Sequence, residues 1–467
     1  MEITRRTLLV GAGTGAVAVL LAACTPEPEP TPTKPAPTAK PTIPTGAVPK
    51  PADWKRSNWS TDPYSRGSMS YLPAGATPQH RADLAEPIGD RLFFAGEAVD
   101  AERPGTVIGA IDSGRRAAVA ASAASREGER IAVIGAGAAG AVAAKTLADS
   151  GRDVTIFEAR DRLGGRIQSI VDDDWPIPVQ LGAWLSTTDD TVSLRDRLAA
   201  LGVEDIDFST ATGWSESGAQ PTVDGAPIAD AVKRAAGGPT DVSIADALKE
   251  DGADPADPAL AAALAWLSAT SGVDIDKASS WYPPGFAPDA LAGATGDVGM
   301  IVEAALEGQK VTQASPVMRI AYDDSGVSLR LGTGESLSFD RVIVTVPLGV
   351  LQKQSIEFAP ALPFAHRGAI AALGAGYVET VWLRFDESFW NADAEIWHVV
   401  GGDGPIRTWL NLEPVTGAPV LVGLVGGPEA RAFAKLNDAD AVATARESLM
   451  FFASETPSPS PSPTETP

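Results

Sequence analysis

Three glycines and one acidic residue have a spacing suited to contact with phosphates and sugar hydroxyls. Gly135, Gly137 and Gly140 stand in G-x-G-x-x-G order, and Glu158 follows them. The first glycine permits a tight turn, the second lets the backbone approach a pyrophosphate, and the third lets a helix pack closely on a strand. The Glu158 carboxylate can accept hydrogen bonds from ribose hydroxyls. The pattern predicts a dinucleotide site.

The elements that must position these residues can be read around them. Residues 131–134 form a short apolar strand, an alanine-rich helix opens directly after the glycines, and 153–157 form a second strand that ends at Glu158. The N-terminus of that helix offers free N–H groups and the positive end of its dipole to an anion. A strand–turn–helix–strand unit of this kind predicts the first part of a Rossmann-like domain.

The next motif narrows the cofactor. Residues 160–166 read RDRLGGR and set two glycines and a guanidinium beside the pyrophosphate. This element resembles the flavin amine oxidase superfamily, which includes monoamine, polyamine and L-amino-acid oxidases and histone demethylases. Four further segments are similar to that family: 180–185 (QLGAWL), 315–320 (SPVMRI), 341–351 (RVIVTVPLGVL) and 383–390 (LRFDESFW). The resemblance implies an α/β fold, with a Rossmann-like FAD-binding domain of the glutathione-reductase type and an α+β substrate domain.

The order of the segments departs from the family. Residues 62–72, 89–97 and 104–116 resemble the stretch that ends an ordinary member, yet here they precede the first Rossmann strand. We infer a circular permutation, with 126–130 joining the moved segment to the strand at Ile131. A helix over 107–125 would be about 28 Å long and would end where that strand must start. Insertion of residues 54–125 into a neighbouring molecule, giving a swapped dimer, is the alternative.

The front of the chain has the features of an export signal. Residues 4–9 (TRRTLL) resemble a twin-arginine signal, and the apolar run 8–23 is too short to span a membrane. It ends in a sequence similar to a bacterial lipobox, which predicts lipid modification of Cys24. Residues 25–51, rich in Pro and Thr, and 454–467, rich in Pro and Ser, are expected to be disordered. We therefore expect export by the twin-arginine route and a lipid anchor on the outer face of the cytoplasmic membrane.

Composition excludes several kinds of site. The formal net charge of −23 leaves no basic footprint for nucleic acid. Cys24 is the only cysteine, which excludes internal disulfides and thiol catalysis in the mature domain. The three histidines, His80, His366 and His398, are far apart in sequence, so no metal site is predicted, and no G-x-S-x-G suggests a hydrolase. The acidity suits solubility, although it could also attract cationic amines.

The predicted organisation follows from these motifs. Residues 1–24 are the signal, 25–51 the tether and 454–467 the tail. Residues 52–187 and 295–350 form the FAD-binding domain, in which 52–125 is the moved flavin segment. Residues 188–294 and 351–453 form the substrate domain.

The resemblance carries the cofactor site onto residues of three segments, and FAD is expected to be bound noncovalently because Ser68 stands where monoamine oxidases have a flavin-linking cysteine. The residues expected at the cofactor are Gly135, Gly137, Ala138, Ala139, Gly140, Glu158, Ala159, Arg160, Gly164, Gly165, Arg166, Gly182, Ala183, Trp184, Val317, Gly96, Glu97, Gly105, Thr106 and Val107.

The substrate side departs from the family pattern. Thr380 stands where many members have a lysine that holds a water at flavin N5, and Met69 replaces a tyrosine of the amine-orienting aromatic cage. Trp59 and Trp409 are the other residues expected near the substrate. Ordinary variation with intact activity, and altered substrate choice or weak oxygen reactivity, both remain open.

The predicted function is oxidation of an amine (polyamine, monoamine or amino acid) by hydride transfer to flavin N5, with O₂ as the acceptor. A non-amine substrate on the same fold and a catalytically weak FAD-binding surface lipoprotein are the alternatives. The sequence leaves the oligomeric state open.

Overall fold

The computed structural model describes residues 48–187, 194–287, 291–390 and 393–453. All of them lie in the unit Pro44–Pro467. The expected signal, Cys24 with its expected lipid modification, most of the expected tether and the expected tail lie outside the described residues, as do 188–193 of the expected substrate domain. Within the described ranges, no helix is both long and apolar enough to cross a membrane.

A parallel sheet of five strands carries the glycine motif. Its order is β13 (Lys310–Thr312), β5 (Asp153–Phe157), β4 (Arg130–Ile134), β17 (Arg341–Val344) and β3 (Leu92–Phe94). Strands β3, β4 and β17 are apolar and buried nearly throughout, as parallel strands covered on both faces must be. The central strand β4 ends at the first glycine, so the motif lies at the carboxyl edge of the sheet.

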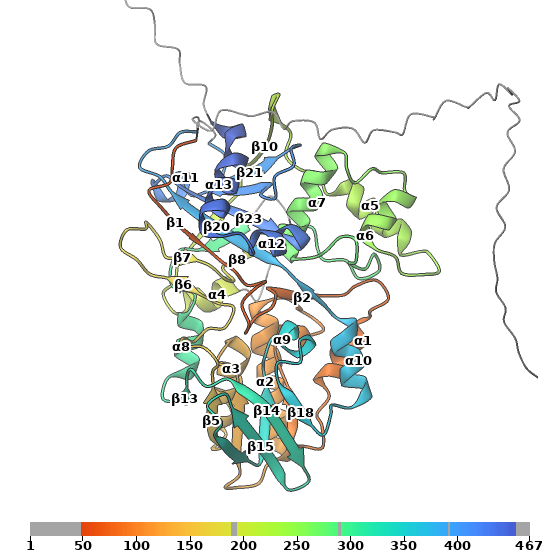
Figure 1. Cartoon of the computed structure of the whole chain (residues 1–467), viewed down its shortest axis with the longest axis vertical. Helices are drawn as coiled ribbons and strands as arrows, with labels where there is room; N and C mark the ends of the chain where they lie inside the picture. The colour runs from red at the N-terminus through yellow and green to blue at the C-terminus, as the bar shows by residue number, and fades with distance from the viewer. Residues whose placement is uncertain (1–47, 188–193, 288–290, 391–392, 454–467) are drawn as a thin grey trace, which may run out of the picture. The chain divides into compact units, whose positions relative to one another are not determined.

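Two layers cover this sheet. Helices α2 (Val107–Ala124) and α3 (Ala138–Asp149) pack on one face, where their alanines meet Ile131, Val133 and Ile343. A four-stranded sheet covers the other face. Its strands are β16 (Ser336–Phe339), β15 (Gly326–Leu331) and β14 (Val317–Asp323), which are antiparallel, and β18 (Glu357–Ala359), which pairs with β14 in parallel. Its Val327 and Leu329 pack in one core with Ala132 and Val342 of the parallel sheet. Figure 1 shows these layers in the lower half of the view.

The front segment is built into this sheet within the chain. Strand β3 lies beside β17 in parallel register, with Val342 opposite Leu92 and Val344 opposite Phe94. Helix α2 then runs back along the sheet and ends at Ala124, and β4 begins at Arg130. The expected helix and the expected short join are therefore confirmed. A strand of the front segment forms the edge of the Rossmann-like sheet.

A second sheet of seven strands carries the expected catalytic position. Its order is β1 (Asp53–Arg56), β20 (Val378–Arg384), β23 (Val420–Gly426), β22 (Thr408–Asn411), β21 (Ile396–Val399), β10 (Ala211–Ser215) and β11 (Gly218–Gln220). Helix α7 (Pro258–Ser271) packs on one face, and α12 (Gly427–Phe433) and α13 (Asp438–Ser448) pack on the other. This sheet occupies the upper half of Figure 1.

The boundaries between the two sheets differ from those expected. Residues 53–56, assigned to the FAD-binding domain, form β1 at the edge of the seven-stranded sheet. Residues 351–373, assigned to the substrate domain, instead supply β18, the end of α9 (Leu348–Gln352) and α10 (Phe364–Ala372), whose apolar side chains join the core around the parallel sheet. Helix α10 packs against α1 (Pro78–Ala85), on the side of the parallel sheet, and not against the second sheet.

The remaining elements complete the substrate side. The segment expected to hold helices and loops also contains short strands. The strands are β8 (Leu185–Thr187), β9 (Asp205–Phe208) and β12 (Leu291–Ala294). The helices are α4 (Leu194–Ala199), α5 (Ala226–Ala235) and α6 (Ile244–Glu250), and α8 (Met300–Leu306) leads back to the parallel sheet.

The described ends of the chain lie next to each other. Arg446 of α13 donates from Nε to the carbonyl of Pro49 at 3.0 Å and from Nη2 to the carbonyl of Val48. Val48 packs in the same core as Phe452. Arg56 also reaches α13, with Nε 3.0 Å from Oδ1 of Asp438. The start of the front segment is therefore anchored on the last helix.

Candidate functional site

A cavity of about 440 Å³ opens at the carboxyl edge of the parallel sheet. Three separate segments line it: the front segment, the glycine motif with its following loop, and the stretch after α8. The front segment supplies Pro63, Tyr64, Ser65, Arg66, Ser68, Gly96, Glu97 and Ala110. The glycine motif and the loop after it supply Ile134, Gly135, Gly137, Ala138, Ala139, Phe157, Glu158, Ala159, Arg160, Gly164, Gly165, Arg166, Ile167 and Ala183. The later stretch supplies Pro316, Val317, Met318, Thr345, Val346, Pro347, Val350, Ser355 and Ile356.

The glycine motif has the geometry that its spacing requires. Gly135 has φ +105°, and a side chain there would lie 2.6 Å from Oγ1 of Thr345. A Cβ on Gly140 would overlap the carbonyl oxygen of Gly135, so this glycine lets α3 pack on the turn. A Cβ on Gly137 would meet nothing of the protein closer than 3.7 Å, and Gly137 lines the cavity at the start of α3. Because residue 137 has no side chain, the cavity beside it is open to a ligand at the start of α3.

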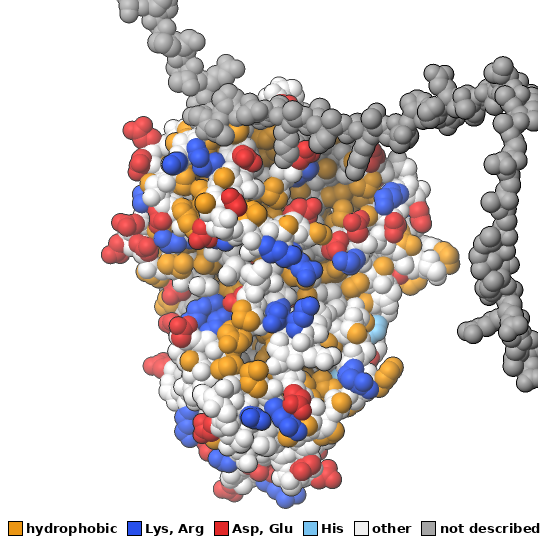
Figure 2. Space-filling view, in the orientation of Figure 1, with side chains coloured by type: hydrophobic (Ala, Val, Ile, Leu, Met, Phe, Trp, Pro, Cys, Tyr) orange, Lys and Arg blue, Asp and Glu red, His pale blue; other side chains and the backbone are white. Residues whose placement is uncertain are grey.

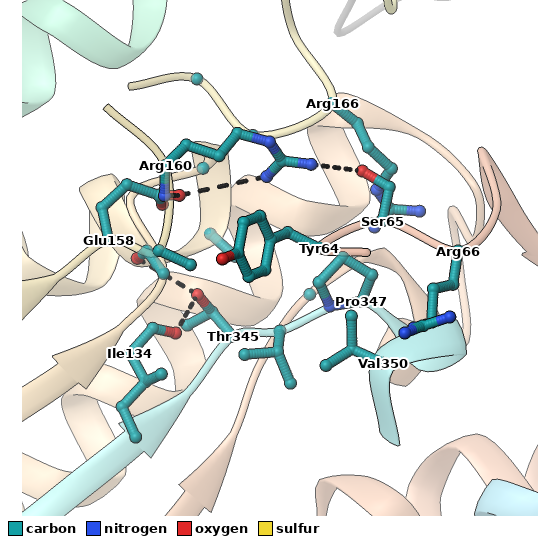
Figure 3. A pocket seen from close by; sticks show the side chains of 18 of the residues that line it. Tyr64, Ser65, Arg66, Ile134, Glu158, Arg160, Arg166, Thr345, Pro347 and Val350 are labelled. Carbon is teal, nitrogen blue, oxygen red and sulfur yellow. Dashed lines mark hydrogen bonds and ion pairs between the residues drawn. The ribbon is translucent and has the colours of Figure 1, made fainter. Parts of the chain in front are cut away.

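Glu158 is held at the end of β5 by backbone donors. Its side chain is almost fully buried; Oε2 accepts from the N–H of Ala136 at 2.8 Å and Oε1 from the N–H of Arg160 at 2.9 Å. These two bonds fix the carboxylate at the cavity wall, close to the glycine turn (Figure 3). A fixed acceptor in that place fits a ribose diol beside a pyrophosphate.

Arg160 connects the glycine-motif loop with the front segment. Its Nη2 lies 2.7 Å from Oδ1 of Asp62 and 2.7 Å from Oγ of Ser65, and its guanidinium lies over the ring of Tyr64. Figure 3 shows Arg160 pointing across the cavity toward Ser65. The two segments therefore share one polar wall.

Glu97 and Arg166 form a second connection between the same segments. Nη1 of Arg166 lies 3.0 Å from Oε1 of Glu97, while Oε2 accepts from Oγ of Ser70 at 2.6 Å and from the N–H of Gly105 at 2.9 Å. Burial alone would raise the pKa of Glu97, but the charges of Arg166 and Arg81 and the bond from Ser70 more than offset it, so this pKa lies below its usual value. Glu97 therefore stays ionised.

Arg66 is a third guanidinium at the cavity that the sequence analysis did not assign. Its backbone has φ +53°, unusual outside glycine, and its Nε is buried without a hydrogen-bond partner. Figure 3 places it beside Pro347 and Val350, away from Arg160. Only the positive φ could have signalled this residue, and the sequence does not show φ.

Comparison with known proteins decides the family. The family described as flavin containing amine oxidoreductase matches residues 42–122 and 238–461, together more than half of the chain. The chain belongs to this family. A match to an NAD(P)-binding Rossmann-like domain covers residues 133–199, between the two parts.

Individual relatives agree with this assignment. Polyamine oxidase 4 of Oryza sativa subsp. japonica is 29% identical over 330 residues, which are 62% of this chain and 66% of that protein. Lysine-specific histone demethylase 1 homolog 1 of Arabidopsis thaliana is 35% identical over 147 residues, 31% of this chain and 17% of that protein. The chain thus matches just under two thirds of the first relative and a much smaller part of the second.

The fold is also that of solved amine oxidases. Wild-type putrescine oxidase bound to putrescine superposes with a TM-score of 0.55 at 18% identity, over 70% of this chain and 81% of that chain. At this identity the likeness concerns the fold, an α/β flavoprotein architecture with a Rossmann-like domain and a second sheet.

The described residues fit a flavin dinucleotide in the cavity at the carboxyl edge of the parallel sheet. A clear space over Gly137 at a helix N-terminus suits a pyrophosphate, the fixed Glu158 carboxylate suits a ribose, and Arg66 leaves a buried donor unpaired. A metal ion has no comparable site, since no group of three or more His, Cys, Asp or Glu side chains gathers in the part of the chain that the structure describes.

Six residues expected at the cofactor do not line the cavity. Gly140 and Gly182 lie in tight packing, where a Cβ would overlap the carbonyls of Gly135 and Arg166. Gly105, Thr106 and Val107 lie at the start of α2, where Oγ1 of Thr106 caps the helix by accepting from the N–H of Gly109.

The sixth residue, Trp184, corrects the prediction. Its ring is buried against Trp382 and Phe208, with centroids 5.3 and 6.0 Å away, and belongs to the core between the two sheets. The neighbouring Ala183, small and exposed, lines the cavity instead. The large apolar ring of Trp184 takes the buried place, and the small side chain of Ala183 takes the exposed one.

Thr380, at the position of the family lysine, is buried on β20. Its Oγ1 has no hydrogen-bond partner among the described residues, and its side chain is 5% exposed. Met69 begins β2 (Met69–Tyr71), which pairs with β19 (Gly374–Gly376) and lies against Gly105 and Gly272. Met69 belongs to the front segment, and Thr380 lies on β20 beside that segment, where its N–H donates to Oγ of Ser57 at 2.8 Å.

The two tryptophans expected near the substrate are both buried. Trp59 is buried, with Nε1 2.7 Å from the carbonyl of Leu181. Trp409 is fully buried on the far face of the seven-stranded sheet, with Nε1 2.9 Å from Oγ of Ser448 in α13. Because Trp409 follows Thr408 directly, its side chain faces away from the row that includes Thr380.

Glu379 is the buried polar group that the sequence analysis missed. Oε1 accepts from the N–H and Oγ of Ser60 at 2.8 and 2.7 Å, and Oε2 accepts from Oγ of Ser57 and, at 3.0 Å, from the N–H of Trp59. Burial raises the pKa of Glu379, and these four bonds oppose the rise without cancelling it. The carboxylate fastens residues 57–60 onto β20, directly beside Thr380.

Proposed function

We propose that this protein binds FAD noncovalently in that cavity and oxidises an amine. The observation that carries the proposal is that three features line one cavity. They are the open space over Gly137, the Glu158 carboxylate held by backbone N–H groups, and the guanidinium groups of Arg66, Arg160 and Arg166. Family membership supports a flavin and an amine substrate. Ser68, in place of a flavin-linking cysteine, has its Oγ occupied by the carbonyl and N–H of Val378, in keeping with noncovalent binding.

Each part of the chain has a defined task in this reaction. Bound FAD would accept a hydride from the carbon that carries the amino group. The N-terminus of α3 and Arg66 would neutralise the pyrophosphate, and Glu158 would orient the adenosine ribose. Glu97, kept ionised by Arg166, would accept hydrogen bonds from the flavin's sugar-alcohol chain. Thr380, whose hydroxyl is buried and unpaired, would hold a water where relatives use lysine.

We further propose that the chain is circularly permuted, with residues 52–125 moved from the end of the ordinary order. Three features support it: β3 at the edge of the parallel sheet, the short join between α2 and β4, and the contacts of Arg446 with residues 48 and 49. A chain reopened between residues 125 and 130, with 453 joined to 48, is expected to bind one FAD as a monomer. If flavin is retained only by a dimer of the natural chain, residues 54–125 are exchanged between molecules.

The place of action is proposed from the front residues alone. A pair of arginines, Arg5 and Arg6, before an apolar run suggests twin-arginine export, and Cys24 suggests a lipid anchor. Replacing Cys24 with serine should release the exported protein from the membrane fraction. Retention of that variant on the membrane would refute a lipid anchor.

The first experiment is a flavin spectrum of the purified protein before and after anaerobic addition of polyamines, monoamines and amino acids. Flavin bands near stoichiometry that bleach with an amine, and return with O₂, are the expected result. Bleaching by an apolar or tetrapyrrole reductant but by no amine would favour the non-amine alternative. Bands that none of these changes would favour a silent FAD-binding lipoprotein, which Thr380 and Met69 make worth testing.

A further inference from the structure

A buried arginine lies behind the front-segment wall of the proposed FAD cavity. Figure 2 shows basic side chains, in blue, at many places on the visible surface, where water solvates their charge. Arg81 of α1 is instead 2% exposed, and Arg341 is the other buried arginine of the described residues. Taking a charged side chain out of water costs free energy unless polar or charged neighbours compensate it. The neighbours of Arg81 should therefore have a structural or functional reason to hold it.

One partner of Arg81 is a hydroxyl group. Its Nη1 donates to Oγ of Ser70 at 2.7 Å, while its Nε is buried without a hydrogen-bond partner in the part of the chain that the structure describes. Burial lowers the pKa of Arg81, and the charges of Glu97 and Asp100 oppose that change. Asp100 already has an ion pair with Arg116, 2.6 Å from Nη2 to Oδ2. Glu97 is the acid that Ser70 contacts, so Arg81 acts on it through the hydroxyl.

The Ser70 hydroxyl connects Arg81 to Glu97. A hydroxyl has one hydrogen to donate; Oγ of Ser70 accepts from Arg81 and gives its hydrogen to Oε2 of Glu97, 2.6 Å away. Oε2 also accepts from the N–H groups of Ser70 at 3.2 Å and Gly105 at 2.9 Å. With three donors on Oε2, the free capacity of this carboxylate lies at Oε1, which Arg166 contacts at 3.0 Å. The carboxylate is therefore fixed as an acceptor.

Arg81 also holds the backbone that carries Glu97. The second bond from Nη1, 2.8 Å long, goes to the carbonyl of Ala98 in the short helix η1 (Glu97–Val99). Helix α1, which carries Arg81, packs against α10, and the two lie side by side in Figure 1. Glu97 lines the cavity, whereas Arg81 and Ser70 do not. Arg81 therefore acts on a ligand of this cavity through the residues that it positions.

We propose that Arg81 is a positioning residue for the flavin half of FAD. Through Ser70 and the backbone of η1, it holds the Glu97 carboxylate as a hydrogen-bond acceptor for the sugar-alcohol chain of the cofactor. This inference rests on the proposed FAD binding and adds Arg81 to it. The adenosine and pyrophosphate half meets other groups, Glu158 and the N-terminus of α3. Loss of Arg81 therefore weakens the contacts with one half of the cofactor and leaves those with the other half unchanged.

The test compares FAD with ADP, which has the adenosine and the pyrophosphate of FAD but neither the sugar-alcohol chain nor the flavin ring. Calorimetry measures the binding of each ligand to the flavin-free full-chain protein and to the variants Arg81→Met, Ser70→Ala and the two combined. Methionine keeps an unbranched apolar stem and removes the charge and the donors. Arg341→Met is the matched control, because Arg341 is 5% exposed and paired with Glu129 at the start of β17, whose other end leads to the cavity residue Thr345.

We expect Arg81→Met and Ser70→Ala each to lower the affinity for FAD about 10-fold and to change the affinity for ADP less than about 2-fold. Because both changes break the same connection to Glu97, the double variant should lose little more than the larger single loss. Arg341→Met should leave the affinity for both ligands within about 2-fold of the wild type, even where it lowers the urea midpoint. Ser70→Ala removes only one hydroxyl, so it keeps the test decisive if Arg81→Met does not fold.

Equal losses of FAD and ADP affinity in the two single variants, unchanged FAD affinity in both, or additive losses in the double variant would overturn the inference. An FAD-specific loss of the same size in Arg341→Met would also overturn it. A wild type that binds no FAD would refute the proposed FAD site together with this inference. Because no amine is present, a protein that shows the FAD-specific loss but oxidises no amine would support this inference and refute only the proposed amine oxidation.

Discussion

Gly137 and Gly140 lie three residues apart in one motif, but the structure predicts opposite consequences for replacing each with alanine. At Gly140 the new Cβ would overlap the carbonyl oxygen of Gly135, which belongs to a turn fixed by β4. At Gly137 the nearest protein atoms would be 3.7 and 3.8 Å away, ordinary contact distances, and the backbone φ of −85° suits any residue. Only the bound cofactor would meet the Gly137 methyl group.

The sizes follow from these distances. Forcing a methyl group into fixed backbone costs about 1–3 kcal/mol, and the 1.9 Å approach to the carbonyl oxygen of Gly135 places Gly140→Ala at the upper end of that range. The gain of alanine over glycine inside a helix returns about 1 kcal/mol, so Gly140→Ala should lose about 2 kcal/mol with or without FAD. For Gly137→Ala, the smaller entropy of the unfolded chain, about 0.4–1 kcal/mol, offsets the poorer helix cap, about 0.5–1 kcal/mol. The free protein should therefore keep its stability within about 0.5 kcal/mol.

FAD separates the two variants. At a free concentration 100 times its Kd, FAD stabilises the wild type by about 2.7 kcal/mol, and Gly137→Ala should lose nearly all of that increment. Urea unfolding of the flavin-free and flavin-loaded proteins measures both quantities. If Gly137→Ala is as unstable without FAD as Gly140→Ala, or if it binds FAD like the wild type, the assignment of the cleared space to the pyrophosphate is wrong.

Three further changes test the rest of the site. Burial raises the pKa of the Glu379 side chain above the ordinary value of 4.5, so the stability that this group contributes is present at low pH and is lost as the pH rises above 4.5. The urea midpoint of the wild type, compared with that of Glu379→Gln, should therefore fall as the pH rises through that range. A difference that does not change with pH would contradict this prediction. Arg166→Met removes the charge and both bonds that Nη1 donates, to Glu97 and to the carbonyl of Ser68, so FAD affinity measured by flavin fluorescence should fall about 10-fold; unchanged affinity would rule out a positioning role. Thr380→Val removes a hydroxyl that has no hydrogen-bond partner among the described residues, so the free energy of unfolding should change by less than about 1 kcal/mol while anaerobic flavin reduction by an amine slows; an unchanged reduction rate would show that this hydroxyl holds no catalytic water.

Much of the candidate cofactor site could be predicted because its signals are local. The spacing of Gly135, Gly137 and Gly140 specifies a turn that only a strand and a helix can flank, and both are present as β4 and α3. Helix α2 and its short join to β4 were predicted from the resemblance of residues 104–116 to the family's flavin segment and from the length of the helix. Most of the residues expected at FAD line one cavity, although they come from segments far apart in the chain.

The substrate side was less predictable because its residues meet only through sheet pairing. Strand β22 is buried on both faces, so its pattern does not show which way Thr408 and Trp409 point. Trp409 was expected at the substrate and lies on the opposite face. Glu379 and its partner Ser57 are 322 residues apart, and no motif connects them.

The position of β3 has a consequence for how the protein is made. Strand β3 joins the parallel sheet through β17, whose last residue, Val344, lies about 250 residues further along the chain. At a synthesis rate of about 5–20 residues per second, this apolar strand waits roughly 12–50 s on the ribosome before its partner exists. The order of the segments in this chain thus creates an early apolar strand that must be shielded from aggregation until nearly three quarters of the chain has emerged.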